Sequence, residues 1–248
     1  MRPNGIVLWE GTSLIDHVTP VVCIATGLVR GSENVKTGGM VQTYILRSDL
    51  APMEAVKTRT DVGICGGCVH RQQADGNRTC YVNLAHGPSG VYGAYVRNVY
   101  PHVSLSEATA LCANKMVRLG TYGDPAAVPL HVWKAVTALA KGHTGYTHQW
   151  RKVQFQGLKH YTQASCETEQ DVVRANARGF GTFHVLPLGA PVPSKVLHCP
   201  ASVELGKGTT CEQCGACNGR KGVNVVIYAH GPTMKRYTGS VRALPVMG

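Results

Sequence analysis

The stretch Val117–Gly142, VRLGTYGDPAAVPLHVWKAVTALAKG, decides the predicted fold. Residues 117–125 favour a strand that ends in a loop, with Asp124 as the N-cap of a helix and Pro125 at its first position. Apolar side chains then recur at helical spacing until Gly142 ends the pattern: Val128, Val132, Trp133, Val136 and Ala140. The stretch therefore predicts a strand followed directly by a helix.

The same alternation extends over most of the chain after Cys80. There, strands are predicted at residues 145–150, 159–166, 181–187 and 223–230, and helices at residues 82–99, 104–116 and 167–178. Before Cys80, strands are predicted at residues 5–9, 19–25 and 40–46. Ser104 and Glu107 can form a capping box, and Ser165 or Thr168 can cap the last helix. Alternating strands and helices predict an α/β fold with a largely parallel sheet and right-handed crossovers.

A first set of cysteines lies in the segment GICGGCVHRQQADGNRTCYVN, residues 63–83. Cys65 and Cys68 form a CxxC motif, and Cys80 follows within reach of a loop. Three thiolates can thus converge on one metal ion or iron–sulfur cluster, which leaves the fourth corner open for a distant ligand, a substrate or a cofactor. Buried thiols or a disulfide are the alternatives. In a chain without a secretory signal, CxxC beside a third cysteine favours a metal or a cluster.

A second set lies near the end of the chain. Cys199 is followed by a CxxCxxC run, Cys211, Cys214 and Cys217. Four thiolates at these spacings suit a closed tetrahedral site. Cys23 falls within a predicted strand and Cys112 on the apolar face of a predicted helix, so both are predicted to be core residues.

Composition indicates a globular protein of 248 residues, 44% hydrophobic and 16% charged. The N-terminal sequence MRPNGIVLWEG does not have the pattern of a signal peptide, and no apolar run approaches membrane-spanning length. We therefore expect a cytoplasmic protein, the host cytoplasm if it is phage-encoded. Reducing conditions there would keep ten cysteines available for metals.

The net charge of +11 permits contact with nucleic acid or another polyanion. The basic residues are scattered and form no long run, so a solvated basic surface explains them equally well. Nucleic acid is therefore kept as a candidate partner, and no membrane interaction is predicted.

In α/β folds, ligands gather at the carboxyl ends of the parallel strands. This rule selects Asp124, His148, Gln149, Cys166 and His184, with Asp124 and Cys166 as the candidate catalytic residues. Each has a structural alternative: Asp124 as a helix cap, His148 as a core histidine and Cys166 as a buried thiol. No P-loop or dinucleotide-binding motif is present in the sequence.

Several short motifs occur in a characteristic order: CxxC with a later CY (residues 65–81), RLGTYGDP (118–125), YTQAS (161–165), and HCPAS followed by CxxCxxC and AHG (198–231). In this order they resemble a poorly characterised group of phage-encoded cysteine-rich proteins, which is similar to radical S-adenosylmethionine (radical-SAM) enzymes. The likeness covers roughly residues 60–231 and leaves out the N-terminal segment.

This resemblance implies a partial (β/α) barrel with a 4Fe–4S cluster at its mouth. Cys65, Cys68 and Cys80 would hold the cluster, and its open iron would bind S-adenosylmethionine. Gly123 and Asp124 would contact the cofactor amine, with His148 as a further cofactor contact. The last four cysteines resemble an auxiliary cluster site or a zinc site. The chain departs from the radical-SAM hallmark CxxxCxxC, since Cys80 lies well downstream of Cys65 and Cys68.

The predicted organisation is a β-rich N-terminal extension (residues 1–60), a partial α/β barrel with the first cysteine site (61–190), and a four-cysteine metal site with the last strand (191–248). The predicted function is that of an iron–sulfur metalloprotein with radical or redox chemistry at the barrel mouth, where Cys166 would be a hydrogen donor or an extra ligand. The alternatives are a metal-stabilised nucleic-acid-binding protein without enzymatic activity, and two structural zinc sites with no chemistry.

Overall fold

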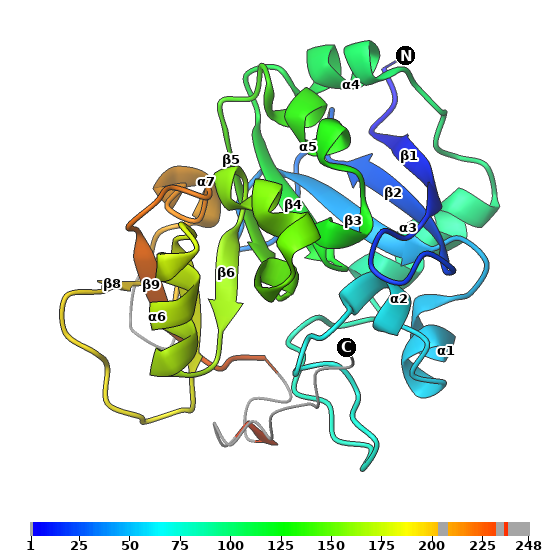
Figure 1. Ribbon diagram of the computed structural model, residues 1–248. Coiled ribbons are helices and arrows are strands. Elements are labelled where there is room, and N and C mark those ends of the chain that lie inside the picture. Colours follow the sequence, from blue (N-terminus) through cyan, green and yellow to red (C-terminus); the bar gives the residue numbers. More distant parts are fainter. Residues whose placement is uncertain (1, 203–207, 232–235, 238–248) are drawn as a thin grey trace.

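The computed structural model describes residues 2–202, 208–231 and 236–237. Its centre is a nine-stranded sheet with the strand order β1-β2-β3-β4-β5-β6-β7-β9-β8 (Figure 1). The strands are β1 (Gly5–Thr12), β2 (Pro20–Thr26), β3 (Val41–Arg47), β4 (Met116–Tyr122), β5 (Gly142–Thr147), β6 (Gln163–Cys166), β7 (Thr182–Leu186), β8 (Leu197–His198) and β9 (Asn224–Tyr228).

The sheet combines an antiparallel part with a longer parallel part. β1, β2 and β3 pair antiparallel, whereas all pairs from β3 to β9 are parallel, and β8 pairs parallel with β9 at the edge. The sheet does not close, because β1 and β8 occupy its two edges. The predicted α/β class and the largely parallel sheet are confirmed.

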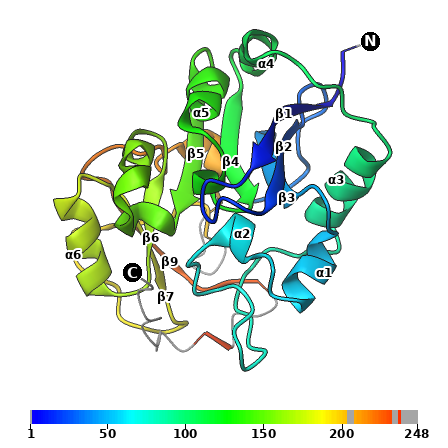
Figure 2. The same cartoon turned by 45° about the vertical axis from the view of Figure 1, so that its right-hand side comes forward.

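Helices connect these strands and cover the sheet. They are α1 (Pro52–Lys57), α2 (Val62–Cys65), α3 (Gly87–Val96), α4 (Leu105–Cys112), α5 (Leu130–Thr137), α6 (Glu169–Ala177) and α7 (Cys211–Cys214), with 3-10 helices η1 (Pro125–Ala127), η2 (Gln149–Arg151) and η3 (Val153–His160). Figure 2 shows α3 beside the β1–β3 end of the sheet and α6 at the opposite end. No helix in the described ranges has the length and apolar character needed to cross a membrane.

The single helix predicted after Asp124 is wrong in its extent. Asp124 does cap a helical turn, since its carboxylate accepts from the Ala126 N–H, but that turn is η1 and ends at Ala127. Pro129 forces Val128 into an extended conformation, with φ −113° and ψ 142°, and so separates η1 from α5. Gly142 begins β5 and is not the end of the helix.

Two other predicted elements also differ from the structure. Residues 153–160 form η3, so β6 begins at Gln163, later than the predicted strand at 159–166. The helix predicted at 82–99 is limited to α3, which starts with Pro88 in its first turn. The Ser104–Glu107 capping box and the Thr168 cap are confirmed.

One sheet contains strands from all three predicted segments, residues 1–60, 61–190 and 191–248. The buried core shows how they pack together. β2 and β3 are buried on both faces, and Ile24 and Ile45 are fully buried between layers. Cys23 and Cys112 are core residues, as predicted. A second, smaller apolar cluster surrounds the C-terminal cysteines and includes Phe183 and Ile227. Residues 1–60 thus share a sheet with the rest, while parts of the segment 191–248 lie outside the described residues.

Candidate functional site

A pocket opens at the carboxyl ends of the parallel strands. It holds about 900 Å³ of space, including solvent at its open side. Its lining combines the first cysteine loop with strand ends: Cys65, Cys68, His70, Thr79, Cys80, Tyr81, Val82, Gly120, Thr121, Tyr122, Gly123, Asp124, Tyr146, His148, Ser165, Phe183, Val185, Ala229 and His230. Of the residues that the strand-end rule selected, Asp124 and His148 line this pocket.

The CxxC turn is shaped by α2 and by one glutamine. α2 ends at Gly66, whose φ of +56° and ψ of −133° suit glycine, and the Cys68 N–H then donates to the Cys65 carbonyl at 3.2 Å. From the end of β5, the Gln149 amide donates to the Cys65 carbonyl at 3.2 Å and accepts from the Gly67 N–H at 3.4 Å. Cys65 and Cys68 are thereby held on the pocket wall.

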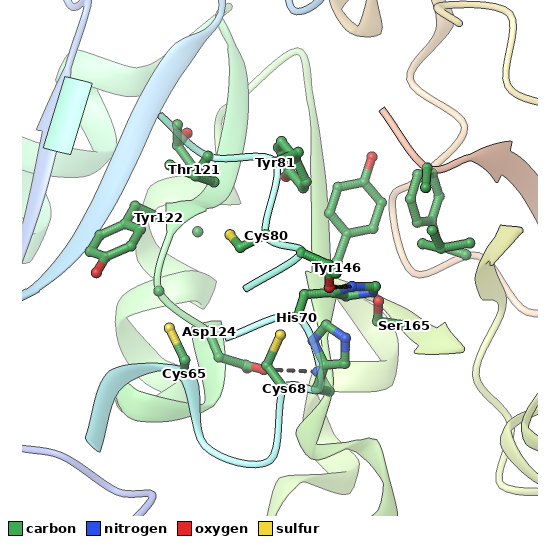
Figure 3. Close-up of a pocket in the computed structure, with 18 of the residues that line it drawn as sticks. Cys65, Cys68, His70, Cys80, Tyr81, Thr121, Tyr122, Asp124, Tyr146 and Ser165 are labelled. Atoms are coloured by element: carbon green, nitrogen blue, oxygen red, sulfur yellow. Dashed lines mark hydrogen bonds between the residues drawn. The ribbon is translucent and has the colours of Figure 1, made fainter. Parts of the chain in front are cut away.

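Cys80 returns to this turn through the backbone of His70. The His70 carbonyl accepts from the Thr79 N–H at 3.1 Å and from the Cys80 N–H at 2.8 Å. The side chain of Arg78 donates to the Cys80 carbonyl at 3.2 Å. In Figure 3 the sulfur atoms of Cys65, Cys68 and Cys80 face the same space. The three predicted ligands of the first site are therefore brought together.

Further contacts anchor the loop to the sheet. Asp61, which is almost fully buried, accepts from Arg71 at 2.7 Å in an ion pair that closes the cysteine loop. The Asp124 N–H donates to the Ile64 carbonyl at 2.7 Å, which links the end of β4 to α2. The cysteine loop and the β4 turn therefore form one connected wall of the pocket.

The described cysteines form no disulfide, and the surroundings of Cys65 and Cys80 disfavour the charged form of their thiols. Burial raises the pKa of Cys65 well above its usual value, and Cys68, Asp61 and Cys80 raise it further. Burial also raises the pKa of Cys80, against the opposing effect of Arg78. Ligation needs thiolates, so a bound cation or cluster would relieve this cost.

We expect Gly66→Ala to disrupt the CxxC turn, whereas Gly67→Ala is a matched control. A Cβ on Gly66 would lie 2.4 Å from the Gln149 amide nitrogen, and the backbone there is of the glycine type. A Cβ on Gly67 would meet only the Gln149 oxygen at 4.0 Å. Strain of this kind costs about 1–3 kcal/mol in the free energy of unfolding, measurable by urea denaturation. Equal losses in both variants would contradict this account of the turn.

Asp124 is held entirely by protein donors. Its Oδ1 accepts from the Ala126 N–H at 2.9 Å and the Thr147 hydroxyl at 2.7 Å, and its Oδ2 accepts from the His148 N–H at 2.8 Å. Burial raises its pKa, although these hydrogen bonds oppose the change. The carboxylate thus ties the end of β4 to the end of β5 while lining the pocket.

Gly123 provides close packing at the same turn. Its φ is +81°, and a Cβ would lie 2.6 Å from both the Cβ and the carbonyl oxygen of Ile45. Any larger residue would push the turn away from β3. The absence of a side chain at this position also leaves the pocket wall open, as does Gly120, whose φ is +69°.

His148 takes part in a buried polar group with two residues that were not predicted. Its Nε2 lies 3.0 Å from Glu167 Oε1, and His70 Nε2 lies 3.7 Å from the same oxygen. Ligating atoms of these three residues all lie within 4.8 Å of one another, and no other set of three among the described residues meets that limit.

The pKa values of the two histidines shift in opposite directions. Burial lowers the pKa of His148, but Cys68 and Glu167 outweigh it, so its pKa is raised well above the usual value. Burial and the neighbouring His148 lower the pKa of His70 to about 4. Its Nε2 is buried without a hydrogen-bond partner in the described part of the chain, a condition that costs about 1–3 kcal/mol.

The remaining candidates at the strand ends lie elsewhere. Cys166 is fully buried in the main core and does not line the pocket, because alternation along β6 directs Ser165 there. Burial raises the pKa of Cys166, which suits a core thiol. His184 is also buried and does not line the pocket.

The C-terminal cysteines surround a second, smaller cavity. Cys199, Cys211, Cys214 and Cys217 all line it. The Cys211 N–H donates to the Lys36 carbonyl at 2.9 Å, and the Gly145 N–H donates to the Cys217 carbonyl at 2.9 Å. These two hydrogen bonds fix the CxxCxxC segment against the sheet. The four predicted residues of the second site are therefore also brought together.

Tyr146 lies between the two cysteine sites. It lines both cavities, and its hydroxyl opposes the rise that burial causes in the pKa of Cys217. The guanidinium of Arg118 lies 5.4 Å from the centre of its ring and donates to the Tyr81 hydroxyl at 2.9 Å. The sites are thus joined by one aromatic ring.

Sequence analysis missed His70, Glu167 and Tyr146. Glu167 directly follows β6, whose end at Cys166 agrees with the predicted strand, so the strand-end rule could have selected it. His70 lies within the cysteine loop, where only the fold of the loop shows its direction.

Comparisons with protein family models, with curated proteins and with solved structures gave no match to this chain. The fold and the site by themselves define a mixed α/β protein whose pocket at the carboxyl ends of parallel strands is lined by thiols and imidazoles.

Proposed function

We propose that the protein is an iron–sulfur protein that holds a 4Fe–4S cluster at Cys65, Cys68 and Cys80 and binds a small molecule in the adjoining pocket. The observation that carries this proposal is the convergence of the three thiols on one space at the carboxyl ends of the parallel strands (Figure 3). Three thiolates from protein leave one iron available to a ligand.

The spacing of the donors supports a cluster over a single ion. Four ligands at Zn–S distances of about 2.3 Å place sulfurs about 3.8 Å apart. The described residues include one set of three donors within 4.8 Å, and the cysteines do not belong to it. A cluster of several iron atoms is larger than one ion and accepts more widely spaced thiolates.

We propose S-adenosylmethionine as the small molecule and a partial barrel, made by β3–β7 and β9, as the fold. When bound beside a cluster, this cofactor supplies a carbon radical through one-electron reduction of its sulfonium. The chain would contribute the open backbone at Gly120 and Gly123 and the polar side chain of His148, which also lines the pocket. Asp124 would act by holding the ends of β4 and β5 together, since its oxygens already have protein donors.

We propose that the second set of cysteines holds an auxiliary cluster or a zinc ion. The ring of Tyr146, with the guanidinium of Arg118 against it, would then lie between the two metal centres. That short separation favours an auxiliary cluster, since electrons pass readily between closely spaced centres.

Anaerobic purification followed by analysis of iron, acid-labile sulfide and zinc tests this proposal. We expect iron, sulfide and a broad absorbance near ~400 nm, together with reductant-dependent cleavage of S-adenosylmethionine. A colourless protein that contains zinc only would overturn the cluster. A cluster-loaded protein that never cleaves S-adenosylmethionine would overturn the cofactor assignment alone.

The second candidate function is metal-stabilised binding of nucleic acid without catalysis. Its support is the net charge of +11. Binding of this kind should weaken steeply as salt increases, because it depends on the release of counterions from phosphates. Titration of labelled single- and double-stranded DNA at two salt concentrations would test it independently of the metal content.

A further inference from the structure

We propose that His70, His148 and Glu167 form a separate site for one divalent transition-metal ion, on the pocket wall beside the cysteine set. The site has two imidazoles and one carboxylate, and none of them is a proposed cluster ligand. This inference therefore stands whether or not a cluster is bound.

The distances fit a single ion. Ligands about 2.0–2.1 Å from a tetrahedral metal lie about 3.3 Å from one another. Glu167 Oε1 lies 3.0 Å from His148 Nε2 and 3.7 Å from His70 Nε2, which brackets that value. Ligating atoms of all three residues lie within 4.8 Å of one another. Only small side-chain adjustments are needed to place an ion between them.

The second nitrogen of His70 is positioned as in known metal sites. A ligating histidine usually has its other ring nitrogen engaged by a hydrogen-bond partner, which fixes the tautomer. His70 Nδ1 lies 2.9 Å from the Thr79 hydroxyl. With Nδ1 protonated, the lone pair of Nε2 is directed toward Glu167, and this nitrogen is buried without a hydrogen-bond partner in the described part of the chain.

The three side chains are largely buried from solvent, but the two histidines can be reached from the pocket. The side chains are 13% exposed for His70, 15% for His148 and 2% for Glu167. Both histidines line the pocket, so a fourth coordination position would face it. Three protein ligands with an open position are typical of catalytic rather than structural metal sites.

The donor set indicates the class of ion. Two imidazole nitrogens and one carboxylate oxygen suit Zn²⁺ or Fe²⁺, whereas Mg²⁺ and Ca²⁺ prefer oxygen ligands throughout. The alternative is a metal-free ion pair between His148 and Glu167. That alternative accounts for the 3.0 Å contact but leaves His70 Nε2 unsatisfied.

Cobalt(II) binding tests the proposal, because Co²⁺ replaces Zn²⁺ and its spectrum distinguishes thiolate from nitrogen and oxygen ligands. Reduced, metal-stripped wild-type protein would be titrated beside Glu167→Gln, His70→Ala and the control His131→Ala, which changes an exposed histidine on α5. Circular dichroism with chelator present would show that each variant is folded. All ten cysteines are kept in every sample, so differences between the samples report on this site.

We expect Glu167→Gln and His70→Ala to lose one equivalent of Co²⁺, with binding at least about 100-fold weaker, since changes to second-layer residues already cost about 10–100-fold. The lost equivalent should carry no thiolate-to-cobalt absorption. Thr79→Val should weaken the same equivalent by about 10–100-fold. Equal stoichiometry and affinity in wild type and Glu167→Gln would overturn the proposal, as would loss of thiolate absorption together with that equivalent.

Discussion

Cys65→Ala is expected to reduce the iron and sulfide bound at the first cysteine site at least about 10-fold, while metal at the second site is retained. The thiol of Cys65 is one of three that face the pocket, and loss of one ligand must exceed the roughly 10–100-fold effect of altering a second-layer contact. Iron and sulfide analysis after anaerobic reconstitution measures the change. Cleavage of S-adenosylmethionine should disappear with the iron.

Cys112→Ala is the matched control for this experiment. Cys112 is as buried as any cysteine in the chain but lies on α4, in the main core. The Cys112→Ala substitution should leave the metal content unchanged. If Cys65→Ala retained full iron while Cys199→Ala lost it, the cluster would belong to the second site and our assignment of the first would be wrong.

Trp133→Ala is expected to lower the free energy of unfolding by about 3–5 kcal/mol. Trp133 is fully buried under the β4 turn, and its indole N–H donates to the Pro125 carbonyl at 2.9 Å. Removing the ring leaves a cavity and removes one of the two hydrogen bonds that the Pro125 carbonyl accepts, the other coming from the Val128 N–H at 3.2 Å. Urea denaturation of the metal-free protein gives the change in stability.

Trp133→Phe separates the two contributions. It keeps much of the ring volume and loses one hydrogen bond to a carbonyl that still accepts from the Val128 N–H, so we expect a loss of about 0.5–1.5 kcal/mol. Because the Pro125 carbonyl supports the turn that lines the pocket, metal-loaded Trp133→Ala should also bind small molecules less tightly. An alanine variant as stable as wild type would show that this tryptophan does not support the turn.

The two metal proposals share one pocket and therefore have a joint consequence. The cysteine set and the His70–His148–Glu167 group approach each other through Cys68, which raises the pKa of His148. A small molecule bound in the pocket would contact both walls. Two metal centres of different ligand type beside one cavity would suit a substrate that is held by one and altered at the other.

Local sequence pattern determined the class of fold and the positions of most elements. β-branched runs bounded by Gly and Pro predicted β2, β3, β7 and β9 to within one or two residues, because burial on both faces leaves few alternatives to a strand. The spacing of the cysteines likewise predicted which of them would gather, since a CxxC turn directs two sulfurs to the same side regardless of the remaining fold.

Only the tertiary structure decided which side chains reach the pocket. β6 ends at Cys166, as predicted, but its orientation in the sheet turns Ser165 toward the cavity and Cys166 into the core, and the path of the cysteine loop brings His70 to Glu167. The placement of the cysteine loop depends on contacts with residues far along the chain, such as those of Gln149 with Cys65 and of Asp124 with Ile64. Such contacts are long-range in sequence, so no local pattern encodes them.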